Sequence, residues 1–189
     1  MIIAVVVLVL IVAVAAYATR RENDNWNIRK AFGPEYDRVR TEYGGARAAD
    51  RELARRIRVH DELRLEPVST EEQDSYAMSW ERIQGGFPDD PAVALRGAER
   101  LVTRLLATRG YPATDRGEQL ALLSVQHGNT LVEYRQAQWT SERLQVTPSR
   151  VTTDQMRTAL MQYQAFFEEL LLTAGTATPR RIQQTEATP

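Results

Sequence analysis

An uncharged apolar run occupies residues 2–18, and Arg20 and Arg21 follow it almost directly. A helix rises about 1.5 Å per residue, so the run spans about 26 Å, near the lower limit for a bilayer core of about 30 Å. Tyr17 stands where an aromatic ring lies at a membrane surface, and the arginine pair can reach lipid headgroups. The run therefore predicts a transmembrane anchor over residues 1–19, with membrane lipid as its partner.

A cleaved signal peptide is the alternative interpretation of the same run. Residues 13–15 and 16–18 both fit the small-x-small pattern of a cleavage site. A signal peptide also carries basic residues before its apolar region, whereas no Lys or Arg precedes this one. Basic residues after the run favour keeping that side in the cytoplasm. We therefore expect a retained single-pass anchor in the cell membrane, with the N-terminus outside and the C-terminal domain cytoplasmic.

The charges of the chain nearly balance, with 24 basic and 25 acidic residues and a formal net charge of −1. Nucleic acid is therefore not an expected general partner, because non-specific binders of nucleic acid are strongly basic. The chain has no Cys, which excludes disulfides and thiol chemistry. The residues beyond the anchor suffice for one domain of ordinary size.

Apolar residues beyond the anchor recur three and four positions apart, the spacing of amphipathic helices. The clearest set is Met156, Leu160, Tyr163, Phe167 and Leu170. Strand alternation is absent from the sequence, apart from a short candidate at residues 63–65. We predict an all-α fold, in which an N-terminal transmembrane helix precedes a soluble bundle of five or six helices. The predicted organisation is an anchor at 1–19, a juxtamembrane linker at 20–32, a helical domain at 33–173 and a disordered tail at 174–189.

Three predicted helix starts carry side chains that can bind the free N–H groups of a first turn. They are Ser69 with Glu72, Asp90 before Pro91, and Thr152 with Gln155. Gly110 is expected to end a helix in the left-handed conformation, and Asn129 is a candidate N-cap for a helix that runs to residue 144.

A stripe of arginines is the candidate binding surface of the sequence. It consists of Arg47, Arg51, Arg55 and Arg58, which recur at helical spacing. Such a stripe can dock onto phospholipid headgroups, an RNA backbone or an acidic partner. The alternative is an ordinary solvated helix face, and we favour it because acidic residues are interleaved with the arginines. These acidic residues are Asp50, Glu52, Asp61 and Glu62.

Catalytic and metal-binding patterns are weak. His60 and His127 are the only histidines, and neither has a second His three or four residues away, so we expect no metal. His60 continues an apolar stripe and is interpreted as a structural residue. Ser124 with His127 is a possible nucleophile pair, but no G-x-S-x-G motif surrounds the serine, and local bonding is the preferred interpretation.

The remaining polar pairs and aromatic residues have structural explanations. In the pair at 89–90 the second aspartate caps a helix, and the adjacent glutamates at 168–169 cannot face one pocket together. Four aromatic residues are expected as buried or half-buried anchors: Tyr76, Trp80, Trp139 and Tyr163. No glycine-rich phosphate loop is present. We therefore expect no enzyme, no cofactor and no small-molecule substrate.

Residues 32–38, with the sequence FGPEYDR, resemble a family of small single-pass bacterial membrane proteins, common in high-GC Gram-positive bacteria and without an assigned function. The likeness continues through RGYP at 109–112 and LSVQH at 123–127, and through residues 51–56, 134–135 and 163–171. The chain departs from the family pattern at Pro88 and Gly128. The resemblance implies a membrane anchor with a cytoplasmic helical domain, and it implies no catalytic residues.

Together these observations predict a membrane-anchored cytoplasmic module without catalytic activity, whose helical domain binds a protein partner of unknown identity. The alternative function is peripheral binding of anionic lipid or nucleic acid through the arginine stripe.

Overall fold

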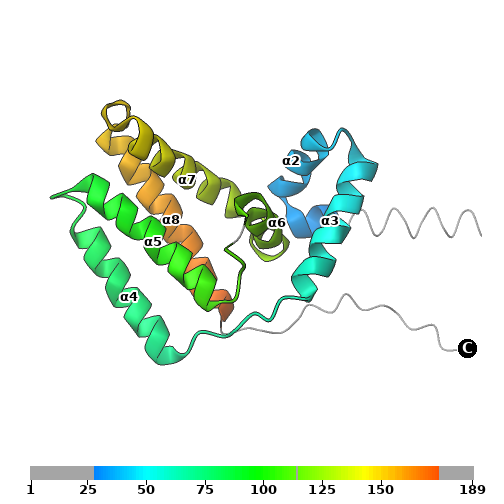
Figure 1. Ribbon diagram of the computed structural model, residues 1–189, viewed down its shortest axis with the longest axis horizontal. Coiled ribbons are helices and arrows are strands. Elements are labelled where there is room, and N and C mark those ends of the chain that lie inside the picture. Colours follow the sequence, from blue (N-terminus) through cyan, green and yellow to red (C-terminus); the bar gives the residue numbers. More distant parts are fainter. Residues whose placement is uncertain (1–27, 114, 175–189) are drawn as a thin grey trace, which may run out of the picture.

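A computed structural model describes residues 28–113 and 115–174 (Figure 1). The predicted anchor at 1–19, its alternative cleavage sites, most of the linker and the tail from residue 175 lie outside the described residues. Within the described ranges, no helix combines the length and the apolar character that crossing a bilayer requires.

The described residues are helical and contain no strand, so the predicted all-α class is confirmed for this part of the chain. Between residues 34 and 174 the structure has seven α-helices, where the sequence predicted five or six, together with one short 3-10 helix. They are α2 (Pro34–Glu42), α3 (Ala46–Asp61), α4 (Thr70–Gly85), α5 (Pro91–Thr108), α6 (Arg116–His127), α7 (Leu131–Val146), η1 (Pro148–Arg150) and α8 (Thr153–Ala174). Residues 28–32 are helical as well, and residues 63–65 form no strand.

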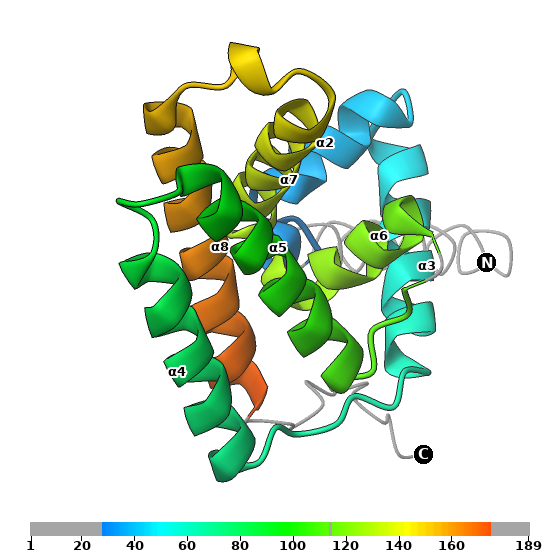
Figure 2. The ribbon, with the colours of Figure 1, turned by 60° about the vertical axis from the view of Figure 1, so that its left-hand side comes forward.

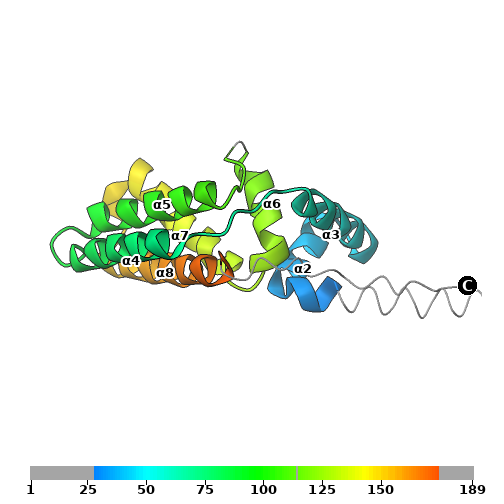
Figure 3. The ribbon, with the colours of Figure 1, turned by 90° about the horizontal axis from the view of Figure 1, so that it is seen from below.

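The helices fall into two groups, joined by α6 (Figures 1 and 3). Helices α4, α5, α7 and α8 lie side by side and form the large lobe (Figure 2). Residues 28–32, α2 and α3 form the small lobe at the opposite end of the molecule. Phe32 is buried and Ile28 packs on the small core, so packing begins before the predicted domain boundary at residue 33.

Most of the predicted helix starts and ends are confirmed. The side chains of Ser69 and Glu72 form a capping box at α4, and Asp90 accepts a hydrogen bond from the Val93 N–H at the start of α5. Thr152 and Gln155 bond reciprocally before α8, and Gly110 follows α5 with a φ of +86°.

The predicted cap at Asn129 is wrong. Helix α7 begins after Thr130, and no side chain caps it. Gly128 and Thr130 keep nearly helical backbone angles, so the chain lacks the extended residue that an N-cap needs. Asn129 instead lies against Gly33, where a Cβ atom would come within 2.6 Å of its Oδ1.

Three of the four aromatic residues expected in the interior are buried, namely Tyr76, Trp80 and Tyr163. Trp80 stacks on Phe167 with ring centroids 5.0 Å apart. The fourth prediction is wrong, because Trp139 is 57% exposed. Helix α7 turns its other face inward at this point, and the Arg143 guanidinium covers the exposed indole ring at 4.6 Å.

Candidate functional site

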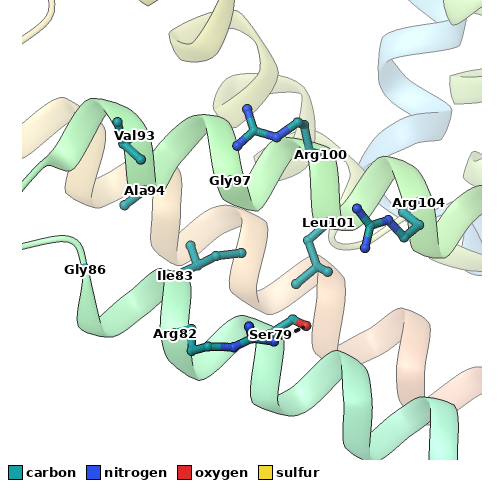
Figure 4. A pocket seen from close by; sticks show the side chains of 10 residues that line it. All are labelled: Ser79, Arg82, Ile83, Gly86, Val93, Ala94, Gly97, Arg100, Leu101 and Arg104. Atoms are coloured by element: carbon teal, nitrogen blue, oxygen red, sulfur yellow. Dashed lines mark hydrogen bonds between the residues drawn. The ribbon is translucent and has the colours of Figure 1, made fainter.

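A pocket of about 420 Å³ lies between α4 and α5 (Figure 4). Helix α4 contributes one face of the pocket, and α5, which returns antiparallel to it, contributes the other. Ten residues line it: Ser79, Arg82, Ile83, Gly86, Val93, Ala94, Gly97, Arg100, Leu101 and Arg104. The sequence did not single out this pocket, because its residues come from two helices whose pairing is not visible in either one alone.

The floor of the pocket is apolar. Ile83 and Leu101 point into the space between the two helices, and Ala94 lies beside them (Figure 4). Gly97 allows α4 to approach closely here, because a Cβ atom at this position would lie only 3.2 Å from the Ile83 side chain. The small residue thus keeps the floor open along α5.

Three arginines give the pocket a positive charge, and none of its lining residues is acidic. Arg82 is partly engaged, since its guanidinium donates hydrogen bonds to the Met78 carbonyl and to Ser79 Oγ. Within the described part of the chain, Arg100 and Arg104 form neither a hydrogen bond nor an ion pair, and both are exposed. Free guanidinium groups bind carboxylates and phosphates, often with two parallel hydrogen bonds.

The arginine stripe predicted from the sequence lies on α3. Arg47, Arg51 and Arg58 are exposed and make no ion pair with another described residue. Arg55 differs from these three because its guanidinium contacts the carboxylates of Glu52 and Glu118, on α3 and α6. The structure therefore separates Arg55 from the other members of the stripe.

A buried ion cluster centred on Glu35 connects α2 with α3 and α7. The Glu35 carboxylate is 0% exposed and accepts hydrogen bonds from Arg38, Arg56 and Arg135. The distances from the guanidinium nitrogens to Glu35 Oε1 are 2.7, 3.1 and 3.0 Å. Arg56 lies on the same helix as the arginine stripe, but it is only 3% exposed and also donates to Glu52.

Both carboxylates of this cluster are held in the charged form. Burial alone raises the pKa of Glu35, but the bonds from Arg38 and Arg135 outweigh it and lower the pKa to about 2. The hydrogen bonds from Arg55 and Arg56 likewise lower the pKa of Glu52 to about 2. A paired charge at this depth links the three helices to one another.

Ser124 and His127 do not form a nucleophile pair. Ser124 is buried, donates to the Ala121 carbonyl at 2.6 Å and accepts from Arg56 at 3.2 Å. His127 is also buried, and its ring nitrogens face Glu169 and Tyr111 rather than the serine. A catalytic serine needs its Oγ bonded to the base and open to substrate, and Ser124 meets neither condition.

His127 belongs to a second polar cluster, which links α6 to α8. Its Nδ1 donates to Glu169 Oε1 at 2.7 Å, because a carboxylate can only accept. Burial raises the pKa of Glu169, yet the bond from His127 prevails and the net pKa is lowered. On the other side of the ring, the Tyr111 hydroxyl lies 3.5 Å from Nε2, and burial raises the pKa of Tyr111 to about 12. The sequence assigned His127 only local bonding and missed this contact across 42 residues.

His60 is buried near Tyr111, as its place on an apolar stripe predicted. Burial lowers its pKa. In residues 28–113 and 115–174, no three His, Asp or Glu side chains are grouped closely enough to hold a metal ion. Asp90 acts as the helix cap that the sequence indicated.

Comparisons of the chain with protein-family models, with curated proteins and with solved structures gave no match. The family resemblance of residues 32–38 therefore stays a prediction. The geometry nevertheless gives this block a physical role: Phe32 enters the small core, Gly33 adopts a φ of +51°, and Glu35 centres the ion cluster.

Proposed function

We propose that the protein is a membrane-anchored helical module that binds a protein partner in the α4–α5 pocket and has no catalytic activity. The observation that supports this proposal is the pair of free arginines, Arg100 and Arg104, beside an apolar floor. The anchor at residues 2–18 would hold the module at the cytoplasmic face of the cell membrane.

Binding is favoured over catalysis because, among the described residues, the Glu35 and His127 clusters are buried and the α4–α5 pocket holds no nucleophile beside a base. The Glu35 and Glu169 carboxylates, whose pKa values are lowered, bond to arginines of the ion cluster and to the buried His127. In the α4–α5 pocket the only hydroxyl belongs to Ser79, which donates to the Ser75 carbonyl and accepts from Arg82. No general base lines this pocket.

An acidic amphipathic helix is the occupant that fits this lining. Its apolar side chains would cover Ile83 and Leu101, and its carboxylates would pair with Arg100 and Arg104. The lining on α5 extends from Val93 to Arg104, which corresponds to about 16 Å, or three helical turns. Aromatic residues, on which nucleic-acid bases stack, are absent from the lining.

Site-specific crosslinking in cells tests this proposal. A photoreactive amino acid replaces Val93, which lines the pocket and is exposed, and in a control chain it replaces the exposed Met161 on α8. We expect one protein to be crosslinked from position 93 and not from position 161. Arg100→Glu with Arg104→Glu should reduce that crosslink at least about tenfold, because two ion pairs become repulsions.

The matched control carries Arg47→Glu with Arg51→Glu, which makes the same charge change at the same spacing on α3. This control should leave the crosslink at position 93 unchanged. A crosslink that survives the α5 reversal, or one that is lost equally in both double variants, would contradict binding in the α4–α5 pocket.

A further inference from the structure

The outer face of α3 carries three arginines that the proposed pocket does not use. At about 100° per residue, Arg47, Arg51 and Arg58 fall within an arc of about 40°, and they extend over about 16 Å of the helix. The opposite face of α3 is buried through Ala49, Leu53, Arg56 and His60. The three arginines therefore point away from the rest of the molecule.

Two of the four acidic residues that the sequence set against these arginines are engaged elsewhere. Asp50 accepts a hydrogen bond from the Tyr36 hydroxyl on α2 at 3.1 Å. Glu52 is bound by Arg55 and Arg56. Only Asp61 and Glu62, at the C-terminal end of the helix, stay exposed. The interpretation as a solvated face assumed that four acidic residues balance the arginines. In the structure only two of the four stay available to do so.

The lobe that carries this face also contains the N-terminal end of the described structure. Ile28, the first described residue, packs on the same small core as Leu53 of α3. Only nine residues, 19–27, separate Ile28 from the apolar run, and a chain of that length reaches at most about 30 Å. Helix α3 lies at the end of the molecule opposite to α4 and α5 (Figures 1 and 3). A membrane that holds the proposed anchor therefore lies within about 30 Å of Ile28, in the lobe that contains α3.

We infer that the outer face of α3 binds the anionic phospholipid surface beside the anchor, through Arg47, Arg51 and Arg58. This inference rests on the proposed anchor. Arginines near a membrane are attracted to anionic headgroups, and the tether makes this contact intramolecular. Tyr43, which is 43% exposed just before α3, supplies the kind of amphipathic ring found at membrane surfaces. Bound in this way, the small lobe faces the lipid and leaves the α4–α5 pocket open to a partner.

The absence of Cys from the chain makes a direct measurement possible. Ala54 stands on the outer face between Arg51 and Arg58, and Ala54→Cys provides a single site for a fluorescent label. The full chain is placed in vesicles of phosphatidylcholine, with or without phosphatidylglycerol, that carry a headgroup quencher. A label at Met161→Cys on α8 serves as the control position.

We expect strong quenching at position 54 only in vesicles that contain phosphatidylglycerol, and little quenching at position 161. Three arginines at a charged surface favour the docked state about a hundredfold. Arg47→Glu with Arg51→Glu should therefore return the quenching at position 54 to its level in neutral vesicles, as should about 1 M salt. Arg100→Glu with Arg104→Glu, the matched control, should leave it unchanged.

Other outcomes overturn the inference. Quenching at position 54 that is equal in neutral and anionic vesicles, or unaffected by the α3 reversal, excludes a charge-dependent contact. Loss of quenching when single-stranded RNA is added, with RNA binding that requires Arg47 and Arg51, would assign this face to nucleic acid. Failure of the chain to float with neutral vesicles would instead refute the anchor, and flotation with anionic vesicles alone would then still reveal binding by α3.

Discussion

The small lobe buries five hydrophobic residues and is joined to α6 and α7 by ion pairs, whereas the large lobe is built around aromatic and aliphatic side chains. In the small lobe, Glu35 and Arg56 join α2, α3 and α7 through buried ion pairs. In the large lobe, the Tyr134 and Phe166 rings stack with centroids 4.1 Å apart. Hydrophobic burial depends little on pH, but a buried ion pair depends on the charge of both partners.

This difference indicates that the two lobes differ in their sensitivity to single changes. Removal of one partner from a buried ion pair leaves an uncompensated charge, which is among the costliest substitutions in a protein interior. The small core offers little hydrophobic area to offset such a loss, since it contains Phe32, Tyr36, Val39, Ala49 and Leu53. We therefore expect the junction of the small lobe to be the weakest point of the described structure under acid or charge substitution.

Glu35→Gln should have the largest effect. The amide keeps the shape of the side chain but removes the charge that Arg38, Arg56 and Arg135 share, and Arg56 stays buried. We expect the free energy of unfolding to fall by about 3–5 kcal/mol, measured by urea denaturation. Hydrogen exchange should show that α2 and α3 lose protection before α5 and α8.

The control for this substitution is Glu168→Gln on the exposed face of α8, which should change stability by no more than about 0.5 kcal/mol. If Glu35→Gln costs less than about 1 kcal/mol, or if all helices lose protection together, the small lobe does not depend on the ion cluster as described.

The second largest effect is expected from acid, which should destabilise the small lobe more than the large lobe. Because the pKa of Glu35 is lowered from 4.5 to about 2, its stabilising contribution is complete above pH 4.5 and is lost as the pH falls towards 2. The expected loss is about 3 kcal/mol for this group. Unfolding measured from about pH 6 to about pH 2.5 should show it, with a shallower slope in Glu35→Gln.

Other groups contribute to the same titration in a predictable way. Glu52 and Glu169 also have lowered pKa values, so the Glu35 variant should keep part of the acid dependence. Because the pKa of His60 is lowered, stability also decreases as the pH falls below about 6.5, which is a separate and higher pH range. An identical slope below pH 4.5 in the parent chain and the Glu35 variant would remove Glu35 as a source of acid sensitivity.

Local sequence patterns predicted the helices well because helix starts and buried stripes are properties of neighbouring residues. Ser69 with Glu72 and the stripe from Met156 to Leu170 needed no knowledge of the rest of the fold. The outward position of Trp139 was missed because the weakly amphipathic α7 gives an uncertain inner face, which its packing against α8 decides. Asn129 was misassigned because its neighbours Gly128 and Thr130 keep nearly helical backbone angles, so no extended N-cap residue precedes α7.

The candidate sites were harder to predict because their partners are distant in the sequence. Glu35 is one of two acidic residues in the first turn of α2, and nothing near it in the sequence indicates its contact with Arg135, 100 residues away. The arginine stripe was found from its spacing, but the separate role of Arg55 depends on Glu118 of another helix. The α4–α5 pocket exists only through the pairing of two helices, and no motif in the sequence marks it.

Tyr163→Phe provides the smallest and most selective test of the large lobe. The ring stays in the core, and only the hydroxyl that faces Ser141 Oγ at 3.1 Å is lost. A buried hydrogen bond between neutral groups contributes about 1 kcal/mol, so we expect a decrease of that size in urea denaturation. The decrease should be the same at about pH 6 and about pH 4, because neither hydroxyl titrates in this range.

A double-mutant cycle with Ser141→Ala should recover most of this decrease as coupling between positions 141 and 163. A cost above about 3 kcal/mol, or one that changes with acid, would mean that polar contacts hold the large lobe as they hold the small one.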